Sequence, residues 1–138
     1  MKILFLGDVV GISGCSKIKK DLLNQIEKNK INFVIVNGEN ADETGVGLTK
    51  EICENFFECG VDVITTGNHV WDQKDLMKFI ENENRLLRPK NLFEPAPGKG
   101  FEIYKTKNDI KIGVLNLMGN VFMKKCEDVF EASQKFLK

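Results

Sequence analysis

The sequence predicts an α/β fold, in which flanking helices cover a mainly parallel β-sheet. Short apolar, β-branched segments alternate along the chain with longer segments whose apolar residues recur at helical spacing. The segment Ile31–Val36 ends in four consecutive apolar residues, as expected of a strand that is covered on both faces. We therefore expect the order β-α-β-α-β-α-β-β-α, with helices on both faces of the sheet.

The first half of the chain supplies three strand–helix units. Strands are expected at Lys2–Leu6, Ile31–Val36 and Val61–Thr66. A side chain that can accept a hydrogen bond from the first helical turn precedes each expected helix: Ser16, Thr49 and Asp72. Gly60 follows the last apolar residue of the second helix and is expected to end it.

The second half is expected to hold a stiff loop, a hairpin and a last helix. All three prolines of the chain fall within 88–100, which favours an irregular loop there. Phe101–Thr106 and Ile110–Leu117 flank a short polar segment, a pattern typical of a β-hairpin. A helix is expected over Glu127–Leu137, with its apolar residues facing inward: Val129, Phe130, Phe136 and Leu137.

Composition limits the class of protein and of partner. The 138 residues suit one ordinary domain, and the 20 basic residues balance the 20 acidic ones. No global field therefore favours nucleic acid or an anionic membrane, and phosphate recognition would have to be local. The longest early apolar run, Ile3–Leu6, is too short to span a bilayer, and no signal-peptide core precedes the first charges. A cytoplasmic location without membrane attachment is the expectation.

Polar residues follow three predicted strands at the point where each strand ends. Asp8 follows the first strand, Glu39 and Asn40 follow the second, and Asn68 and His69 follow the third. His69 is the only histidine of the chain. Because the carboxyl ends of parallel strands meet at one edge of a sheet, these side chains are expected to converge there.

These side chains offer only oxygen and nitrogen donors, which suit Mn²⁺, Fe²⁺ or Zn²⁺ better than a soft metal. Glu39 could bridge two metal ions, which would acidify a bound water and clamp a phosphoryl group. His69 would then be free to protonate the leaving oxygen as a general acid. Each tip also has a simpler interpretation, as a turn residue or a surface carboxylate. A third interpretation also stays open. Gly7, Gly11 and Gly14 could form a phosphate-binding loop, and the chain would then be a nucleotide-binding or regulatory module without hydrolysis.

The strand-end motifs resemble those of a known family, the YmdB-like branch of the calcineurin-like metallophosphoesterases. The similar stretches are GDVVG (7–11), NGEN (37–40), GVGLT (45–49), GNHVWD (67–72) and RPKN…PGKG (88–100). The broad superfamily has Asp-x-His after the first strand, GDxxD after the second and GNHD or GNHE after the third. This chain differs from the superfamily motifs at three places: Val10, the NGEN stretch (37–40) and Val70. These differences point to the YmdB-like branch.

The resemblance implies a fold, an activity and roles for five residues. The implied fold is a metallophosphoesterase-like αββα sandwich, of which this chain would hold mainly the first, mostly parallel sheet. Asp8 and Asn40 would bind one metal ion, Glu39 would bridge both, Asn68 would bind the second, and His69 would be the catalytic acid. The implied reaction is phosphodiester hydrolysis with two divalent metal ions, Fe or Mn and otherwise Zn. Its substrates would be small phosphodiesters or nucleotides such as 2′,3′-cyclic nucleotides, including cyclic phosphates derived from RNA.

The family takes further metal ligands from histidines of its second half, and no histidine follows His69 here. Residues 1–138 are therefore expected to be the amino-terminal part of a single, truncated metallophosphoesterase domain. Two outcomes remain open for the isolated chain: it is active, or it is a catalytically incomplete fragment. An uncovered sheet surface would favour self-association, so a homo-oligomer is a further expectation.

Overall fold

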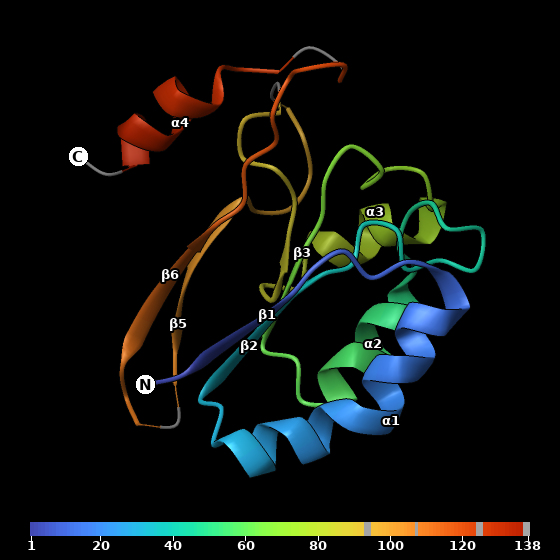
Figure 1. Ribbon diagram of the computed structural model, residues 1–138. Coiled ribbons are helices and arrows are strands. Elements are labelled where there is room, and N and C mark those ends of the chain that lie inside the picture. The colour runs from blue at the N-terminus through green and yellow to red at the C-terminus, as the bar shows by residue number, and fades with distance from the viewer. Residues whose placement is uncertain (93–94, 107, 124–125, 137–138) are drawn as a thin grey trace.

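A computed structural model describes residues 1–92, 95–106, 108–123 and 126–136 of the chain. Its elements follow in this order (Figure 1): β1 (Ile3–Leu6), α1 (Gly11–Asn29), β2 (Phe33–Asn37), α2 (Lys50–Glu58), β3 (Val63–Thr65), α3 (Lys74–Ile80), β4 (Leu86–Leu87), β5 (Phe101–Lys105), β6 (Lys111–Leu115) and α4 (Val129–Phe136).

Four parallel strands form the main sheet in the order β1-β2-β3-β4. Ile3 pairs with Phe33, Ile35 with Val63, and Ile64 with Leu86, so each strand lies beside its neighbour in the sequence. This arrangement confirms the predicted α/β class with a mostly parallel sheet. Strand β4 was not predicted, because its two residues are too few to produce a periodic pattern.

Three helices cover one face of the main sheet. Because side chains alternate along a strand, Val34 and Val36 point to this face, where they join Ile64 and Leu86. The helices contribute buried side chains to the same core: Ile18, Leu22, Cys53, Phe56, Leu76 and Ile80. Trp71 also packs against this core.

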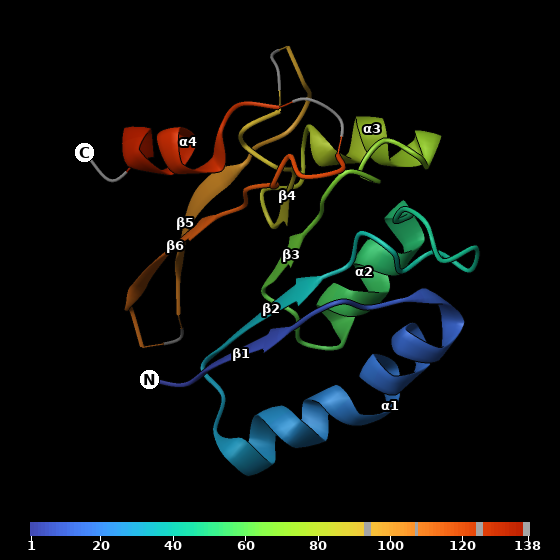
Figure 2. The same cartoon turned by 45° about the horizontal axis from the view of Figure 1, so that its top comes forward.

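A β-hairpin, and not a helix, packs against the opposite face of the sheet (Figure 2). Phe33 and Val63 point to this face and pack with Val114 of β6, while the rings of Phe33 and Tyr104 lie 5.8 Å apart. The expectation of helices on both faces was therefore wrong. An apolar run in β2 indicates that both faces are covered, but it does not specify which element covers them.

The predicted helix starts were correct in one case of three. Thr49 caps α2, since its hydroxyl accepts a hydrogen bond from the Ile52 N–H at 3.3 Å. Ser16 lies inside α1, which begins at Gly11 without a side-chain cap. Asp72 does not cap α3, which begins at Lys74 after Gln73. The Asp72 carboxylate binds His69 instead.

The last helix, α4, begins at Val129, and the Asp128 carboxylate accepts hydrogen bonds from the N–H groups of Phe130 and Glu131. The prediction that its apolar residues face inward was wrong for Phe130, which is 73% exposed, and for Phe136, which is also exposed. Phe136 still contacts the ring of Phe101 on β5, with ring centroids 5.4 Å apart. The predicted end at Leu137 lies outside the described residues.

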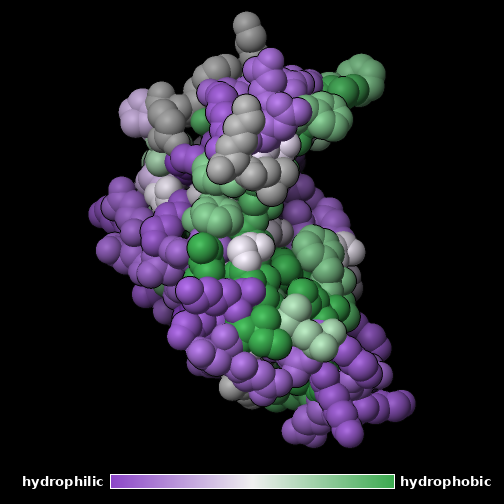
Figure 3. Space-filling view, turned by 90° about the vertical axis from the view of Figure 1, so that its left-hand side faces the viewer, coloured by the Kyte–Doolittle hydropathy of each residue, from purple (hydrophilic) through white to green (hydrophobic). Residues whose placement is uncertain are grey.

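The outer strand β1 carries exposed apolar side chains, Ile3 and Phe5. Figure 3 shows hydrophobic residues gathered in the middle of the side of the molecule that carries the N-terminus and the hairpin. Among the described residues, no helix is long and apolar enough to cross a membrane.

Candidate metal site

Backbone hydrogen bonds hold the ends of β1, β2 and β3 together. The N–H groups of Val9 and Gly11 donate to the carbonyls of Asn37 and Asn40, at 3.0 and 2.9 Å. The Gly38 N–H donates to the carbonyl of Thr65 at 3.0 Å. The three strand-end motifs therefore form one continuous edge, as their positions in a parallel sheet predict.

These backbone contacts count against the phosphate-loop interpretation of the glycines after β1. The Gly11 N–H is bonded to Asn40, and the Gly14 N–H donates to the carbonyl of Val10 at 3.2 Å within α1. A phosphate-binding loop needs free N–H groups that converge on its ligand, and these two already have partners.

Asp8 and Asn40 are in direct contact. The Asn40 side-chain amide donates to the Asp8 Oδ2 at 2.8 Å. The amide nitrogen of Asn40 makes this contact, so the side-chain oxygen of Asn40 is left to act as a metal ligand. Asp8 is exposed at the end of β1.

Glu39 is the most unusual residue of this edge. Burial raises the pKa of its carboxyl above the ordinary value, and the nearby Asp8 carboxylate raises that pKa further. The Asn68 N–H and His69 act in the opposite direction and lower the pKa of Glu39. The Glu39 Oε2 atom is buried and has no hydrogen-bond partner. A buried carboxylate oxygen without a partner destabilises the folded protein unless a cation or a hydrogen-bond donor binds it.

Gly67 supplies the space that Glu39 occupies. A Cβ atom added at Gly67 would overlap Glu39 Oε2, so a side chain at position 67 and the observed position of Glu39 exclude each other. In the sequence, Gly67 stands out only as the first residue of the GNHVWD motif after a predicted strand. Its structural role is this close approach, which depends on a residue 28 positions earlier in the chain.

The donors present at this edge fit a divalent metal ion. The unpartnered Glu39 oxygen lies in a position that only glycine at 67 permits, and Asp8 and Asn40 follow neighbouring strands. Within the described residues, no group of three or more His, Cys, Asp and Glu side chains could by itself hold a metal ion. Amide oxygens of Asn40 and Asn68 would therefore have to contribute, as carboxylate and amide oxygens do for hard cations.

His69 is oriented by the side chain of Asp72, three residues later in the chain. Its Nδ1 lies 2.6 Å from Asp72 Oδ2, so the imidazole ring is fixed by a carboxylate. The ring is partly exposed, and its second nitrogen takes part in no hydrogen bond found among the described residues. A carboxylate that fixes one ring nitrogen leaves the other to exchange a proton with a ligand.

A pocket of about 240 Å³ adjoins Glu39 and Asn68. The strand ends form one wall, and the segment after β6 forms the other: Asn116, Leu117, Met118, Gly119, Val121 and Met123. The residues of this second wall were not predicted to belong to the site. The available signal was Gly119-Asn120, a glycine and an amide placed after a predicted strand as in Gly67-Asn68.

Two buried asparagines hold the second wall in place. The Asn116 side-chain amide donates to the carbonyls of Thr66 and Leu87, at 2.8 and 2.9 Å, which ties the segment after β6 to the ends of β3 and β4. Asn91 binds both the N–H and the carbonyl of Met118, at 2.9 and 2.7 Å.

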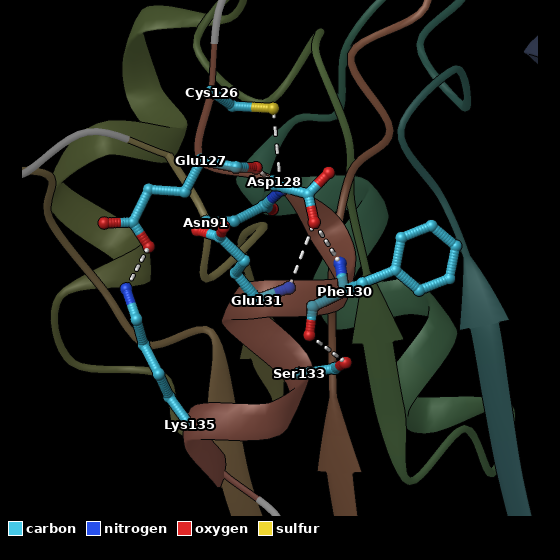
Figure 4. A network of polar contacts seen from close by, with 8 residues as sticks. All are labelled: Asn91, Cys126, Glu127, Asp128, Phe130, Glu131, Ser133 and Lys135. Carbon is cyan, nitrogen blue, oxygen red and sulfur yellow. Dashed lines mark hydrogen bonds and ion pairs between the residues drawn. The ribbon is translucent and has the colours of Figure 1, made fainter.

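Asn91 also anchors the start of α4. Its side-chain amide donates to the carbonyl of Glu127 at 2.9 Å, and its own carbonyl accepts from the Glu127 N–H at 3.0 Å (Figure 4). One buried residue therefore holds both ends of the segment 118–127, in which Met118, Gly119, Val121 and Met123 border the pocket.

Arg88, which could have contacted phosphate, lies away from solvent. Its guanidinium is buried and donates to the carbonyls of Pro97, Pro89 and Ala96. This side chain stabilises the proline-rich loop. An arginine with this many backbone partners has a structural role here.

Comparison with known proteins identifies the family. A family model described as YmdB-like protein matches residues 4–138. This chain belongs to the YmdB-like family. It is 42% identical over 130 residues to a 2′,3′-cyclic-nucleotide 2′-phosphodiesterase of Bacillus subtilis (strain 168), a match that covers 94% of this chain and 48% of that protein.

Two crystal structures share the fold. A hypothetical protein from Thermus thermophilus superposes with a TM-score of 0.91 at 34% identity, over 99% of this chain and 52% of that one. A novel phosphatase from Mycoplasma pneumoniae superposes with a TM-score of 0.90 at 35% identity, over 99% of this chain and 50% of that one. The chain spans about half the length of the relatives it matches.

Proposed function

We propose that this chain forms the amino-terminal part of a metal-dependent phosphodiesterase. The enzyme would hydrolyse phosphodiesters such as 2′,3′-cyclic nucleotides with two divalent metal ions, Fe or Mn and otherwise Zn. Membership of the YmdB-like family and the name of the Bacillus subtilis relative support the reaction class. The cytoplasmic location stays a prediction from the sequence.

The observation that carries the proposal is the buried, unpartnered Glu39 Oε2 beside Gly67. A glutamate that only packed at this edge would find a hydrogen-bond donor for both oxygens or would turn to solvent. A glutamate that bridges cations keeps its oxygens available to them. Asp8 and Asn40 would be further ligands of one metal ion, and Asn68 would be a further ligand of the other.

Bound metal ions would lower the pKa of a coordinated water and offset negative charge on the phosphoryl oxygens. The residues of this chain would do the rest. Asp8 and Asn40 orient each other through their hydrogen bond, and Gly67 keeps the Glu39 carboxylate at the edge. Asp72 fixes His69 at Nδ1, so that a proton on Nε2 can pass to the leaving oxygen.

The test is hydrolysis of 2′,3′-cyclic AMP and an aryl phosphodiester with Mn²⁺ or Fe²⁺. The chain would be assayed alone and with the carboxy-terminal half of the Bacillus subtilis relative as a separate polypeptide. Glu39→Ala and His69→Ala test the site, and Glu43→Ala, at an exposed carboxylate in the following loop, is the control. We expect hydrolysis that both site variants lose and the control keeps. No hydrolysis by either preparation would refute the proposal.

A further inference from the structure

Three consecutive apolar residues are exposed beside the pocket. Val121, Phe122 and Met123 are 74%, 103% and 47% exposed, so Phe122 makes almost no contact with the rest of the molecule. A single exposed apolar residue needs no explanation, but a contiguous run beside a cleft marks a binding surface.

Phe122 has an unfavourable backbone conformation. Its φ of 58° lies in the left-handed region, which a bulky residue rarely adopts. The Met123 N–H donates to the carbonyl of Asn120 at 3.5 Å, which makes Phe122 the third residue of a tight turn. Glycine or asparagine is favoured at a turn position with positive φ. A phenylalanine here combines an unfavourable backbone with full exposure, a combination that packing does not explain.

The turn stands at the rim of the candidate metal site. Val121 and Met123 line the same pocket as Glu39 and Asn68. Phe122 lies between these two residues in the chain, where consecutive Cα atoms are about 3.8 Å apart. It does not line the pocket itself, and its exposed ring stands outside the pocket wall. The Asn91 hydrogen bonds to Met118 anchor the wall before the turn, and Asn91 is itself buried.

We propose that Phe122 is a stacking platform for the nucleobase of a nucleotide substrate. The inference rests on the proposed function, in which the phosphoryl group is held at Glu39 and Asn68. An exposed aromatic ring at the rim is suited to a flat apolar group at the other end of the same ligand, because every base offers a π-face to stack on. Stacking tolerates all four bases, so we expect the platform to favour nucleotides over simple phosphoesters without selecting one base.

The test compares two probes by isothermal titration calorimetry in the presence of Mn²⁺: adenosine 3′-monophosphate and inorganic phosphate. Phe122→Ala should weaken adenosine 3′-monophosphate binding roughly tenfold, the value of one stacked base. It should leave phosphate binding unchanged. Phe122→Trp should keep the nucleotide affinity, and Phe130→Ala, at an exposed phenylalanine on α4, should change neither affinity.

Equal affinities of Phe122→Ala and the wild type for the nucleotide would overturn the proposal, and so would an equal loss for both probes. The second result would mean that Phe122 supports the phosphate site as a whole and does not stack on the base. Phosphate binding without any preference for the nucleotide would leave the proposed function intact and refute the platform alone. Failure of the wild type to bind either probe would refute both.

Discussion

Replacing Gly67 by alanine tests whether the position of Glu39 is functional. The added methyl group would overlap Glu39 Oε2, so the carboxylate must move. Gly67 has no positive φ, and alanine therefore meets no conformational penalty there. The substitution acts through the space that the carboxylate occupies.

The magnitude follows from what must move. A carboxylate at the end of a flexible side chain can turn away, so we expect stability to fall by only about 1 kcal/mol. Metal binding should suffer far more, because the ligand leaves its place. Disturbing the residues that position a ligand costs about 10–100-fold in metal affinity, and we expect at least this loss for Mn²⁺.

Calorimetric titration with Mn²⁺, with unfolding in urea as the check on folding, measures both quantities. Gly119→Ala is the matched control, because an added Cβ there meets no atom within 4 Å. The double variant Gly67→Ala/Glu39→Ala should bind Mn²⁺ no more weakly than Glu39→Ala alone, since both changes remove the same ligand. Wild-type affinity in a folded Gly67→Ala protein would refute the reasoning.

Three further predictions concern an ion pair before β4, the second wall of the pocket and the orientation of His69. Hydrogen bonds from Arg85 lower the pKa of Glu83, so their stabilisation is present above pH 4.5 and is lost as the pH falls through the lowered pKa. Glu83→Gln should cost about 1 kcal/mol at neutral pH and nothing in acid, measured by urea unfolding across pH. Asn91→Leu should destabilise the protein by about 3 kcal/mol in the same assay, because it leaves buried backbone groups unpaired. Asp72→Asn should lower kcat of the complemented enzyme and leave Mn²⁺ affinity unchanged, since Asp72 contacts His69. Weaker Mn²⁺ binding would contradict the assigned role.

The sequence was sufficient to predict the edge of the sheet where the polar residues meet. Parallel pairing of β1, β2 and β3 forces Asp8, Glu39 and Asn68 to one edge, whatever the details of the helices. Short-range signals were less dependable. Asp72 has the right chemistry for a helix cap, but in the folded chain the imidazole of His69 binds its carboxylate.

Features that depend on distant residues could not be predicted from local patterns. Asn91 binds Met118, 27 residues away, and Asn116 binds Thr66, 50 residues away. No periodicity or spacing rule connects such pairs. The second wall of the pocket and the turn at Phe122 therefore became visible only in the folded chain.

The most direct test of the account is an anomalous difference map from a crystal of the protein soaked in Mn²⁺. We predict density in contact with the Glu39 carboxylate and with Asp8 or Asn68. Density at another place, or a structure in which Glu39 Oε2 accepts a hydrogen bond and no metal is bound, would contradict the claim that these strand ends form a metal site.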